Sequence, residues 1–191
     1  MKRFFGLFLV ALAVAAPAVA EGDPVFSARA GVGTDINLGI AVGGGVGYLQ
    51  RFQGLPPVDF GLDLYYSHSV YSEQSGAKNY TYTETTTLVV YAVTANFMHG
   101  YHPGQKGFYF HTGVGVGAVS VDWDHYSPQD TSGYNASGKY TGAGLLVNLG
   151  ASYAFGSGLE ARLQAPILVF NGPLGAVGFA PMLNLVAAMR F

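Results

Sequence analysis

Apolar and polar residues alternate in eight segments of this chain, and the alternation runs to the very last residue. Every odd-numbered position from Leu183 to Phe191 is apolar, whereas the even-numbered positions include Asn184 and Arg190. A period of two residues is typical of a β-strand with one apolar face. The pattern predicts strands over residues 25–34, 38–53, 58–72, 82–101, 107–123, 139–155, 159–170 and 177–191.

The N-terminus carries a segment of a different kind. Lys2 and Arg3 precede an uncharged apolar run over residues 4–16, and Ala18, Val19 and Ala20 form a small-x-small cleavage site. These features predict a secretory signal peptide over residues 1–20 and a mature domain over residues 21–191. A membrane anchor is the alternative, but a helix needs about 20 apolar residues to cross a bilayer.

An exported chain with eight strands of one-sided polarity can be a membrane barrel. Only helices and closed barrels satisfy every backbone hydrogen bond inside lipid, and strands that face lipid on one side suit a closed barrel. The chain has 28 Gly and 13 Tyr, and only 10% of its residues are charged. We therefore predict an all-β fold, an eight-stranded antiparallel up-and-down transmembrane β-barrel. A soluble barrel is the alternative, and it would bury its apolar faces and expose its charges.

Charged residues fall on the faces of the strands that would point into the lumen. A charge that faces a narrow lumen must be paired, because an isolated buried charge costs many kcal/mol. The interior of an eight-stranded barrel is just wide enough for side chains to fill it. We expect a paired network that closes the lumen, and a gated ion path is the alternative. The predicted interior charge cluster consists of Arg29, Arg51, Asp59, Asp63, Glu160, Arg162 and Arg190.

With this architecture, these interior charges and a terminal Phe191, the chain resembles the small OmpA/OmpX-type outer-membrane barrels over its whole mature length. The resemblance implies a location in the bacterial outer membrane, in contact with lipid and lipopolysaccharide, and recognition by the barrel assembly machinery. The assembly signal of such barrels corresponds here to Asn184, Met189 and Phe191, with Val186 where the pattern usually has Gly.

The connections between the predicted strands differ in length. Those at residues 54–57, 103–106 and 156–158 are short, whereas those at residues 73–81 and 124–138 are longer and polar. In outer-membrane barrels the short turns lie in the periplasm and the long loops lie outside. An even number of strands then places both termini in the periplasm.

Small residues and prolines suggest a second feature of the lumen. Glycines line the inward face of several strands, which leaves room either for bulky inward side chains or for an apolar cavity. Pro166 and Pro181 lie on neighbouring strands at almost equal distances from the connection between them, so we expect them to sit nearly opposite each other. Because proline donates no ladder hydrogen bond, the pair predicts a lateral gap. Such a gap resembles the lateral openings of PagP-type palmitoyltransferases and OmpW-type transporters, and it implies an apolar small molecule as a ligand. The predicted pocket is lined by Leu88, Leu146, Leu168 and Phe170.

Three remaining patterns bear on chemistry. The tripeptide from His125 to Ser127 resembles the His-Tyr-Ser of PagL-type lipid A deacylases, but Pro128 follows it and the next Glu is Glu160. His99 and His102 have the spacing of metal ligands without a third ligand nearby in the sequence. The chain has no Cys, and no cluster of Lys and Arg that would bind nucleic acid. We assign no catalytic residue, metal or cofactor.

The sequence thus favours a non-enzymatic outer-membrane barrel with an envelope-structural or surface-interaction role. A passive transporter or binder of apolar ligands is the first alternative, and a lipid A-modifying enzyme is the second.

Overall fold

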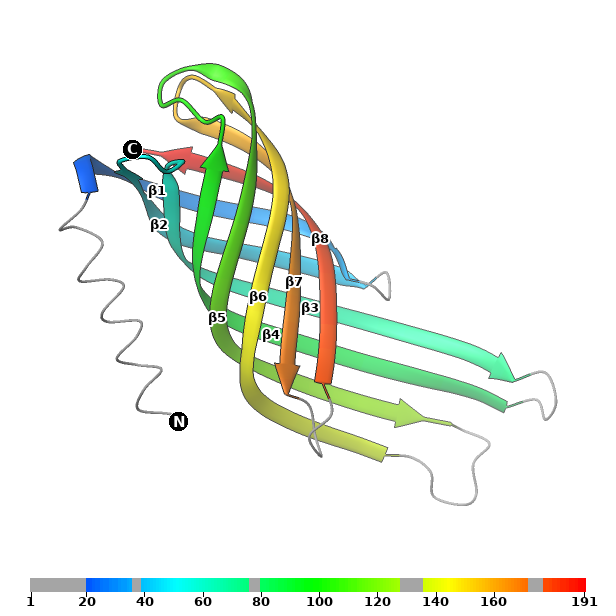
Figure 1. The fold of residues 1–191 in the computed structure, drawn as a ribbon. Helices are drawn as coiled ribbons and strands as arrows, with labels where there is room; N and C mark the ends of the chain where they lie inside the picture. Colours follow the sequence, from blue (N-terminus) through cyan, green and yellow to red (C-terminus); the bar gives the residue numbers. More distant parts are fainter. Residues whose placement is uncertain (1–19, 36–38, 76–79, 128–135, 172–176) are drawn as a thin grey trace.

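The computed structural model describes residues 20–35, 39–75, 80–127, 136–171 and 177–191. It forms one antiparallel sheet in which each strand pairs with the next and β8 pairs with β1, which closes the barrel (Figure 1). The predicted eight-stranded barrel is therefore confirmed. The predicted signal peptide lies outside the described residues except for Ala20, where β1 begins. The strands are β1 (Ala20–Asp35), β2 (Ile40–Phe52), β3 (Val58–Ser75), β4 (Tyr80–His99), β5 (Lys106–Tyr126), β6 (Ala136–Phe155), β7 (Leu159–Asn171) and β8 (Val177–Arg190).

The short turns after β2, β4 and β6 define one end of the barrel, which we call the short-turn end. Gly54, Gly100, Gly104 and Gly156 in these turns have φ angles between 76° and 79°, which glycine adopts without a steric penalty. The first strand starts at this end, because Ala20 pairs with Phe52. The last strand also ends there, since Phe191 exchanges two backbone hydrogen bonds of 3.0 Å with Phe26.

Four strands continue beyond the barrel at the opposite end. The pairing of β2 with β3 stops at His68, and the pairing of β7 with β6 stops at Gly144. The strands β3 to β6 stay paired with one another past these points and run beyond the ends of β7 and β8 (Figure 1). We call this part the four-stranded extension; it comprises residues 69–75, 80–86, 118–126 and 136–143.

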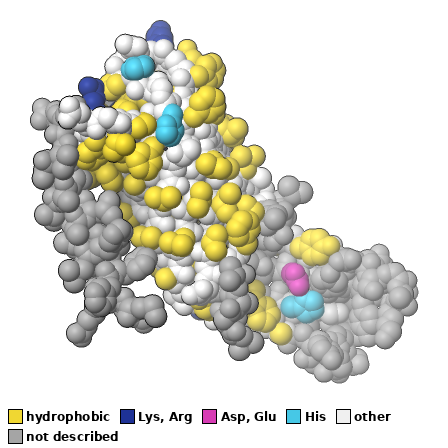
Figure 2. Space-filling view, in the orientation of Figure 1, with side chains coloured by type: hydrophobic (Ala, Val, Ile, Leu, Met, Phe, Trp, Pro, Cys, Tyr) yellow, Lys and Arg dark blue, Asp and Glu magenta, His cyan; other side chains and the backbone are white. Residues whose placement is uncertain are grey.

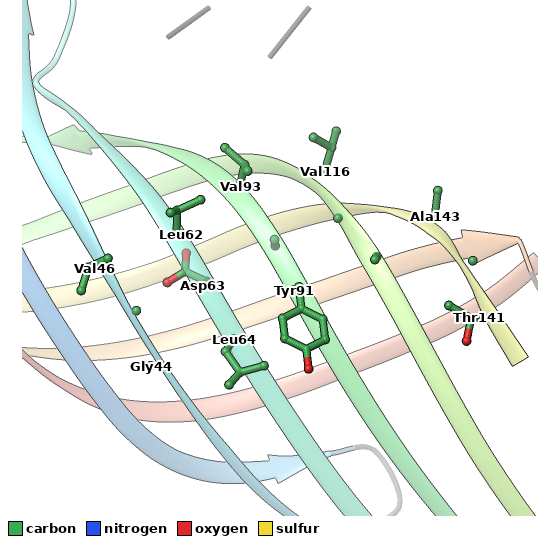
Figure 3. A pocket seen from close by; sticks show the side chains of 15 residues that line it. Gly44, Val46, Leu62, Asp63, Leu64, Tyr91, Val93, Val116, Thr141 and Ala143 are labelled. Carbon is green, nitrogen blue, oxygen red and sulfur yellow. The ribbon is translucent and has the colours of Figure 1, made fainter. Parts of the chain in front are cut away.

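The outside of the barrel is apolar. Exposed and buried positions alternate along the strands, and the exposed positions carry large apolar residues such as Leu62, Tyr91 and Leu145. The described side chains on the face in Figure 2 are largely hydrophobic over the barrel, and the charged ones lie toward the two ends. A hollow in this surface has Gly44, Leu64, Tyr91 and Ala143 among its lining residues (Figure 3). Such a surface suits contact with acyl chains. Among the described residues, no helix is long and apolar enough to cross a membrane.

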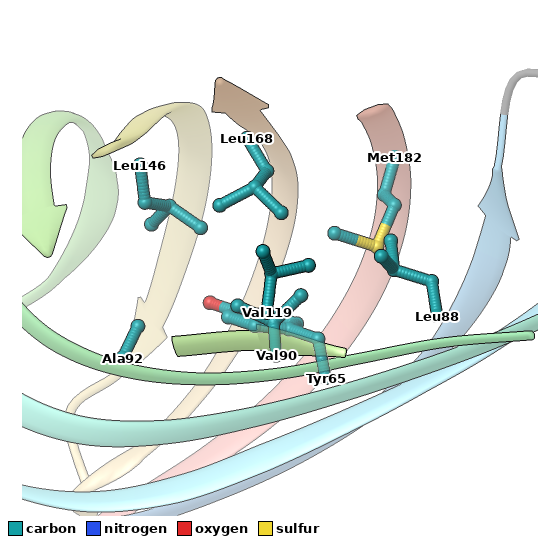
Figure 4. Close-up of a cluster of buried hydrophobic side chains, with 8 residues drawn as sticks. All are labelled: Tyr65, Leu88, Val90, Ala92, Val119, Leu146, Leu168 and Met182. Carbon is teal, nitrogen blue, oxygen red and sulfur yellow. The ribbon is translucent and has the colours of Figure 1, made fainter. Parts of the chain in front are cut away.

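Two apolar clusters lie inside the barrel. The distal apolar cluster lies toward the four-stranded extension, and its side chains converge from β3, β4, β5, β6, β7 and β8 (Figure 4). The proximal apolar cluster lies toward the short-turn end and consists of Leu49, Met98, Tyr101, Tyr109 and Ala154. The members of the distal apolar cluster are Tyr65, Leu88, Val90, Ala92, Val119, Leu146, Leu168 and Met182.

Candidate functional site: the charged lumen

Six of the seven charged residues expected in the lumen come together between β1, β3, β7 and β8. The six are Arg29, Asp59, Asp63, Glu160, Arg162 and Arg190, and each is at most 8% exposed. Each sits at an inward position of its strand, so the period of two residues brings it into the lumen. We call this group the six-charge cluster. It contains three arginines and three carboxylates, so its formal charges cancel.

Two carboxylates hold the arginines of three different strands. Asp59 lies within 3.3 Å of Arg29, within 3.2 Å of Arg162 and within 3.3 Å of Arg190 through the same oxygen, Oδ2. Glu160 accepts hydrogen bonds from Arg162 Nη2 at 2.7 Å and from Arg190 Nε at 2.5 Å. These links connect β1, β3, β7 and β8 across the lumen, so the six-charge cluster also ties the last strands of the barrel to the first.

Asp63 completes the network on the side of β1. Arg29 donates to both of its carboxylate oxygens, through Nε at 2.7 Å and Nη2 at 2.9 Å, which is the bidentate geometry that favours arginine. Thr94 donates a further hydrogen bond of 2.6 Å to Asp63. A buried ion pair offsets its desolvation cost only when such additional hydrogen bonds are present. The pairing therefore stabilises charges that would be untenable alone.

The prediction that Arg51 belongs to this cluster is wrong. Its side chain is exposed, although the alternation along β2, whose inward residues are odd-numbered, would turn residue 51 into the lumen. The pairing of β2 with β3 ends at Gln50, and the register between β1 and β2 shifts between Glu21 and Val25. Arg51 thus lies at the rim of the barrel, where strict alternation no longer determines which side faces the lumen.

The glycines on the inward faces make room for these polar side chains. A Cβ atom at Gly61 would overlap Arg29 Nη2, and one at Gly47 would lie 3.2 Å from Arg29 Nη1. A Cβ atom at Gly45 would overlap Asp63 Oδ1 in the same way. The expected reason for the glycine stripe, space for inward side chains, therefore holds here, and charged residues occupy much of that space.

The proximal apolar cluster covers the six-charge cluster toward the short-turn end. The Tyr101 ring, from the turn after β4, lies 5.0 Å from the guanidinium carbon of Arg190, within the range of a cation–π contact. Tyr109 donates a hydrogen bond of 2.6 Å to Glu160. On the other side, the distal apolar cluster packs beyond Asp63, starting with Tyr65. From the short-turn end, the lumen is therefore filled by the proximal apolar cluster, then by the six-charge cluster, and then by the distal apolar cluster.

Pro166 and Pro181 lie at an interruption of the sheet but do not face each other. Within these fully described strands, the pairing of β7 with β8 runs to Gln164 and resumes at Ile167, which pairs with Pro181. Pro166 is buried at an inward position, whereas Pro181 is half-buried at the alternate, outward position. The two prolines are thus offset by one residue, because the register sets Pro181 opposite Ile167.

The apolar pocket expected behind this interruption is filled. Leu88, Leu146 and Leu168 are 6%, 1% and 1% exposed and belong to the distal apolar cluster (Figure 4). Phe170 packs against the same cluster and stacks on Tyr140, with ring centroids 6.4 Å apart. The expectation of an open pocket lined by these residues is therefore wrong, because their side chains converge and fill the space themselves.

The three residues of the expected assembly signal lie on the two sides of β8. Asn184 is buried in the lumen at 1% exposure, whereas Met189 and Phe191 point outward at 56% and 74% exposure. The backbone hydrogen bonds of Phe191 to Phe26 extend the pairing of β8 with β1 by one residue beyond the strand. All three residues therefore lie on the chain segment that closes the barrel against β1.

His125 has a carboxylate neighbour that the sequence did not suggest. Its Nδ1 atom lies 3.4 Å from Glu84 of β4, because Glu84 and His125 are direct partners in the pairing of β4 with β5. Glu160, the next Glu along the chain, is in the six-charge cluster instead. Of the two histidines with metal-like spacing, His99 is exposed and 2.9 Å from the hydroxyl of Thr112, and His102 is exposed. Among the described residues, no three His, Cys, Asp or Glu are placed to hold a metal ion.

Solved structures of outer-membrane proteins share this fold. Neisserial surface protein A is 16% identical with a TM-score of 0.53, and the match covers 90% of this chain and 99% of that protein. A major outer membrane protein from Thermus thermophilus is 15% identical with a TM-score of 0.60, covering 89% of this chain and 100% of the other. The N-terminal barrel domain of Pseudomonas aeruginosa OprF is 14% identical with a TM-score of 0.51, covering 90% and 100%. No protein-family profile and no curated protein matches the sequence.

These likenesses define the class of fold. The chain has the fold of the eight-stranded outer-membrane β-barrels, with an apolar outer surface and a lumen that holds a six-charge cluster between two apolar clusters.

Proposed function

We propose that this chain is a non-enzymatic outer-membrane barrel whose filled lumen supports an externally displayed sheet, the four-stranded extension. The observation that carries the proposal is the filled lumen: the neutral six-charge cluster lies between the distal and proximal apolar clusters. An ion path would need a continuous polar route, and the buried apolar side chains of the distal cluster interrupt it. The proposed role is therefore to support the four-stranded extension and present it to binding partners, and not to conduct ions.

The proposal includes the surroundings of the barrel. Outer-membrane lipid and the acyl chains of lipopolysaccharide would contact the apolar outer surface, including the hollow beside Leu64 and Tyr91 (Figure 3). The barrel assembly machinery would recognise the β8 seam through Met189 and Phe191. Both termini and the short turns would lie in the periplasm, and the four-stranded extension would lie outside the cell.

Conductance measurements test the filled lumen. We expect the folded protein in planar bilayers to show no steady channel, because the polar network ends at Tyr65, Leu146 and the rest of the distal apolar cluster. Insertion is checked by co-reconstitution with a general porin, whose channels must remain visible, and by the heat-modifiable mobility of the recovered protein. A steady open channel formed by the folded chain alone would contradict the proposal and favour the gated ion path.

A further inference from the structure

The four-stranded extension has two faces of different chemistry. One face continues the lumen surface, because Tyr140 packs against the distal apolar cluster and pairs with Val121. By the period of two residues, this face also carries Tyr71, Trp123 and the Glu84–His125 pair. We call it the aromatic face. The opposite face carries Asp122, which forms an ion pair of 3.1 Å with Lys139, and also Asp124 and Tyr126.

Trp123 lies flat against the sheet on the aromatic face. It is paired with Gly138 of β6, and a Cβ atom at Gly138 would come within 2.7 Å of the indole ring. The glycine therefore lets the ring lie across the neighbouring strand. The side chain is still 39% exposed, so part of the ring is open to solvent. A large aromatic surface held in this way is a platform on which a ligand can stack.

Tyr71 and Glu84 extend the platform across the sheet. Tyr71 is 46% exposed and is the direct partner of Glu84 in the pairing of β3 with β4. Neighbouring strands are about 4.8 Å apart, and Trp123 lies two residues along β5 from His125, which is level with Tyr71. The backbones at Tyr71 and Trp123 are therefore roughly 12 Å apart. That separation is comparable to the length of two linked sugar rings. Glu84 lies on β4, between the two strands that carry the aromatic residues, and His125 lies beside it on β5; both offer hydrogen-bonding groups.

From this arrangement we infer that the aromatic face binds a neutral β-linked oligosaccharide. The faces of an all-equatorial sugar ring carry axial C–H groups, which stack on the electron-rich face of an aromatic ring. Sugar hydroxyls donate to the Glu84 carboxylate, and hydrogen bonds to a charged group are stronger than those between neutral groups. Tyr71 and Trp123 would contact different sugar rings of one oligosaccharide, and Glu84 with His125 would bind hydroxyls of the ring nearest Tyr71.

Charge selects a neutral sugar over an anionic one. Among the described side chains of the aromatic face, the one carboxylate, Glu84, is paired with the one basic group, His125. Among the described residues of the extension, the one lysine, Lys139, lies on the opposite face beside Asp122. A sulfated or phosphorylated glycan would therefore meet a carboxylate without a compensating cluster of cations. The inference relies on the proposed function for access to external glycans, but binding itself depends on the folded protein alone.

Trp123 is the only tryptophan of the chain, so its fluorescence reports directly on this face. The purified full-length protein, folded in a detergent without a sugar headgroup, is titrated with cellotetraose and, separately, with a sulfated tetrasaccharide. We expect a saturable change in emission with cellotetraose and a weaker response to the sulfated sugar. No saturable change with cellotetraose, or stronger binding of the sulfated sugar, would overturn the inference. A response to a basic peptide alone would assign the face to a protein partner and overturn it as well.

Matched variants on the two faces sharpen the test. Glu84→Gln should weaken cellotetraose binding by about tenfold, the size of a lost hydrogen bond to a charged group. Tyr71→Ala should weaken it similarly, whereas Asp122→Asn and Tyr126→Ala on the opposite face should leave it unchanged. Heat-modifiable mobility shows that each variant is folded, and calorimetry gives a second measure of binding. Equal losses on the two faces would overturn the assignment to the aromatic face. Because this assay uses purified protein, it gives the same result whether or not the extension lies outside the cell.

Discussion

At the scale of single residues, Arg162 and Arg51 test the charge network as a matched pair. Arg162 is buried between Asp59 and Glu160, whereas Arg51 is exposed at the rim. We expect Arg162→Ala to destabilise the barrel by about 3–5 kcal/mol, because it removes one partner each from Asp59 and Glu160 and leaves the buried cluster with an uncompensated negative charge. Arg51→Ala should change the stability by less than about 0.5 kcal/mol. Urea unfolding in lipid vesicles, followed by the fraction of heat-modifiable protein, measures both. Similar midpoints for the two variants would show that Arg162 is not buried among charges.

The same two residues show what the sequence can reveal at this scale. Arg162 lies well inside a regular strand, so the alternation places it in the lumen. Arg51 lies two residues beyond Leu49, the last inward residue of β2 before the register becomes irregular, and the sequence carries no sign of that change. The contact of Glu84 with His125 was missed for a related reason: it depends on the register of β4 against β5, which period alone does not fix.

At the scale of whole strands, the alternation located all eight elements, but it did not give their full length. The strands β5 and β6 each include three residues beyond their predicted ends near the long connection. In this part of the chain, Thr, Ser, Asp and Gly occupy many of the positions that are apolar in the barrel, so the alternation that predicts a strand is lost. Its strands persist through pairing with one another, such as Trp123 with Gly138, and cross-strand pairing is not visible in a single segment.

The closing strand supplies a prediction of its own. Deleting Phe191 removes both backbone hydrogen bonds to Phe26 and the exposed aromatic ring at the seam. We expect the truncated chain to give much less heat-modifiable barrel in outer-membrane fractions than the intact chain. Phe179→Ala serves as the control, because Phe179 is a similarly exposed aromatic residue of β8 far from the seam end. Normal assembly of the truncated chain in cells would contradict an assembly role for Phe191.

At the scale of the whole molecule, the two ends of the barrel differ in structure. The short-turn end holds the proximal apolar cluster and brings the start of β1 and the end of β8 together. The other end continues into the four-stranded extension, which presents the aromatic face and, on the opposite side, the Asp122–Lys139 ion pair. Since the six-charge cluster is neutral and buried, it contributes little to the field outside the barrel. The proposed binding of glycans therefore depends on the extension, and the side of the membrane on which the extension lies decides which glycans it can meet.

Cysteine labelling determines that side, and the chain suits it because it has no native cysteine. Ser137→Cys places a thiol on an exposed residue of the extension, and Ser157→Cys places one on an exposed residue of a short turn. In intact cells we expect a membrane-impermeant maleimide to label the first variant and to leave the second unlabelled until the outer membrane is permeabilised. Labelling of both variants after denaturation controls for expression and thiol reactivity. The reverse pattern in intact cells would place the short turns and both termini outside, and the extension, with its aromatic face, would then lie in the periplasm.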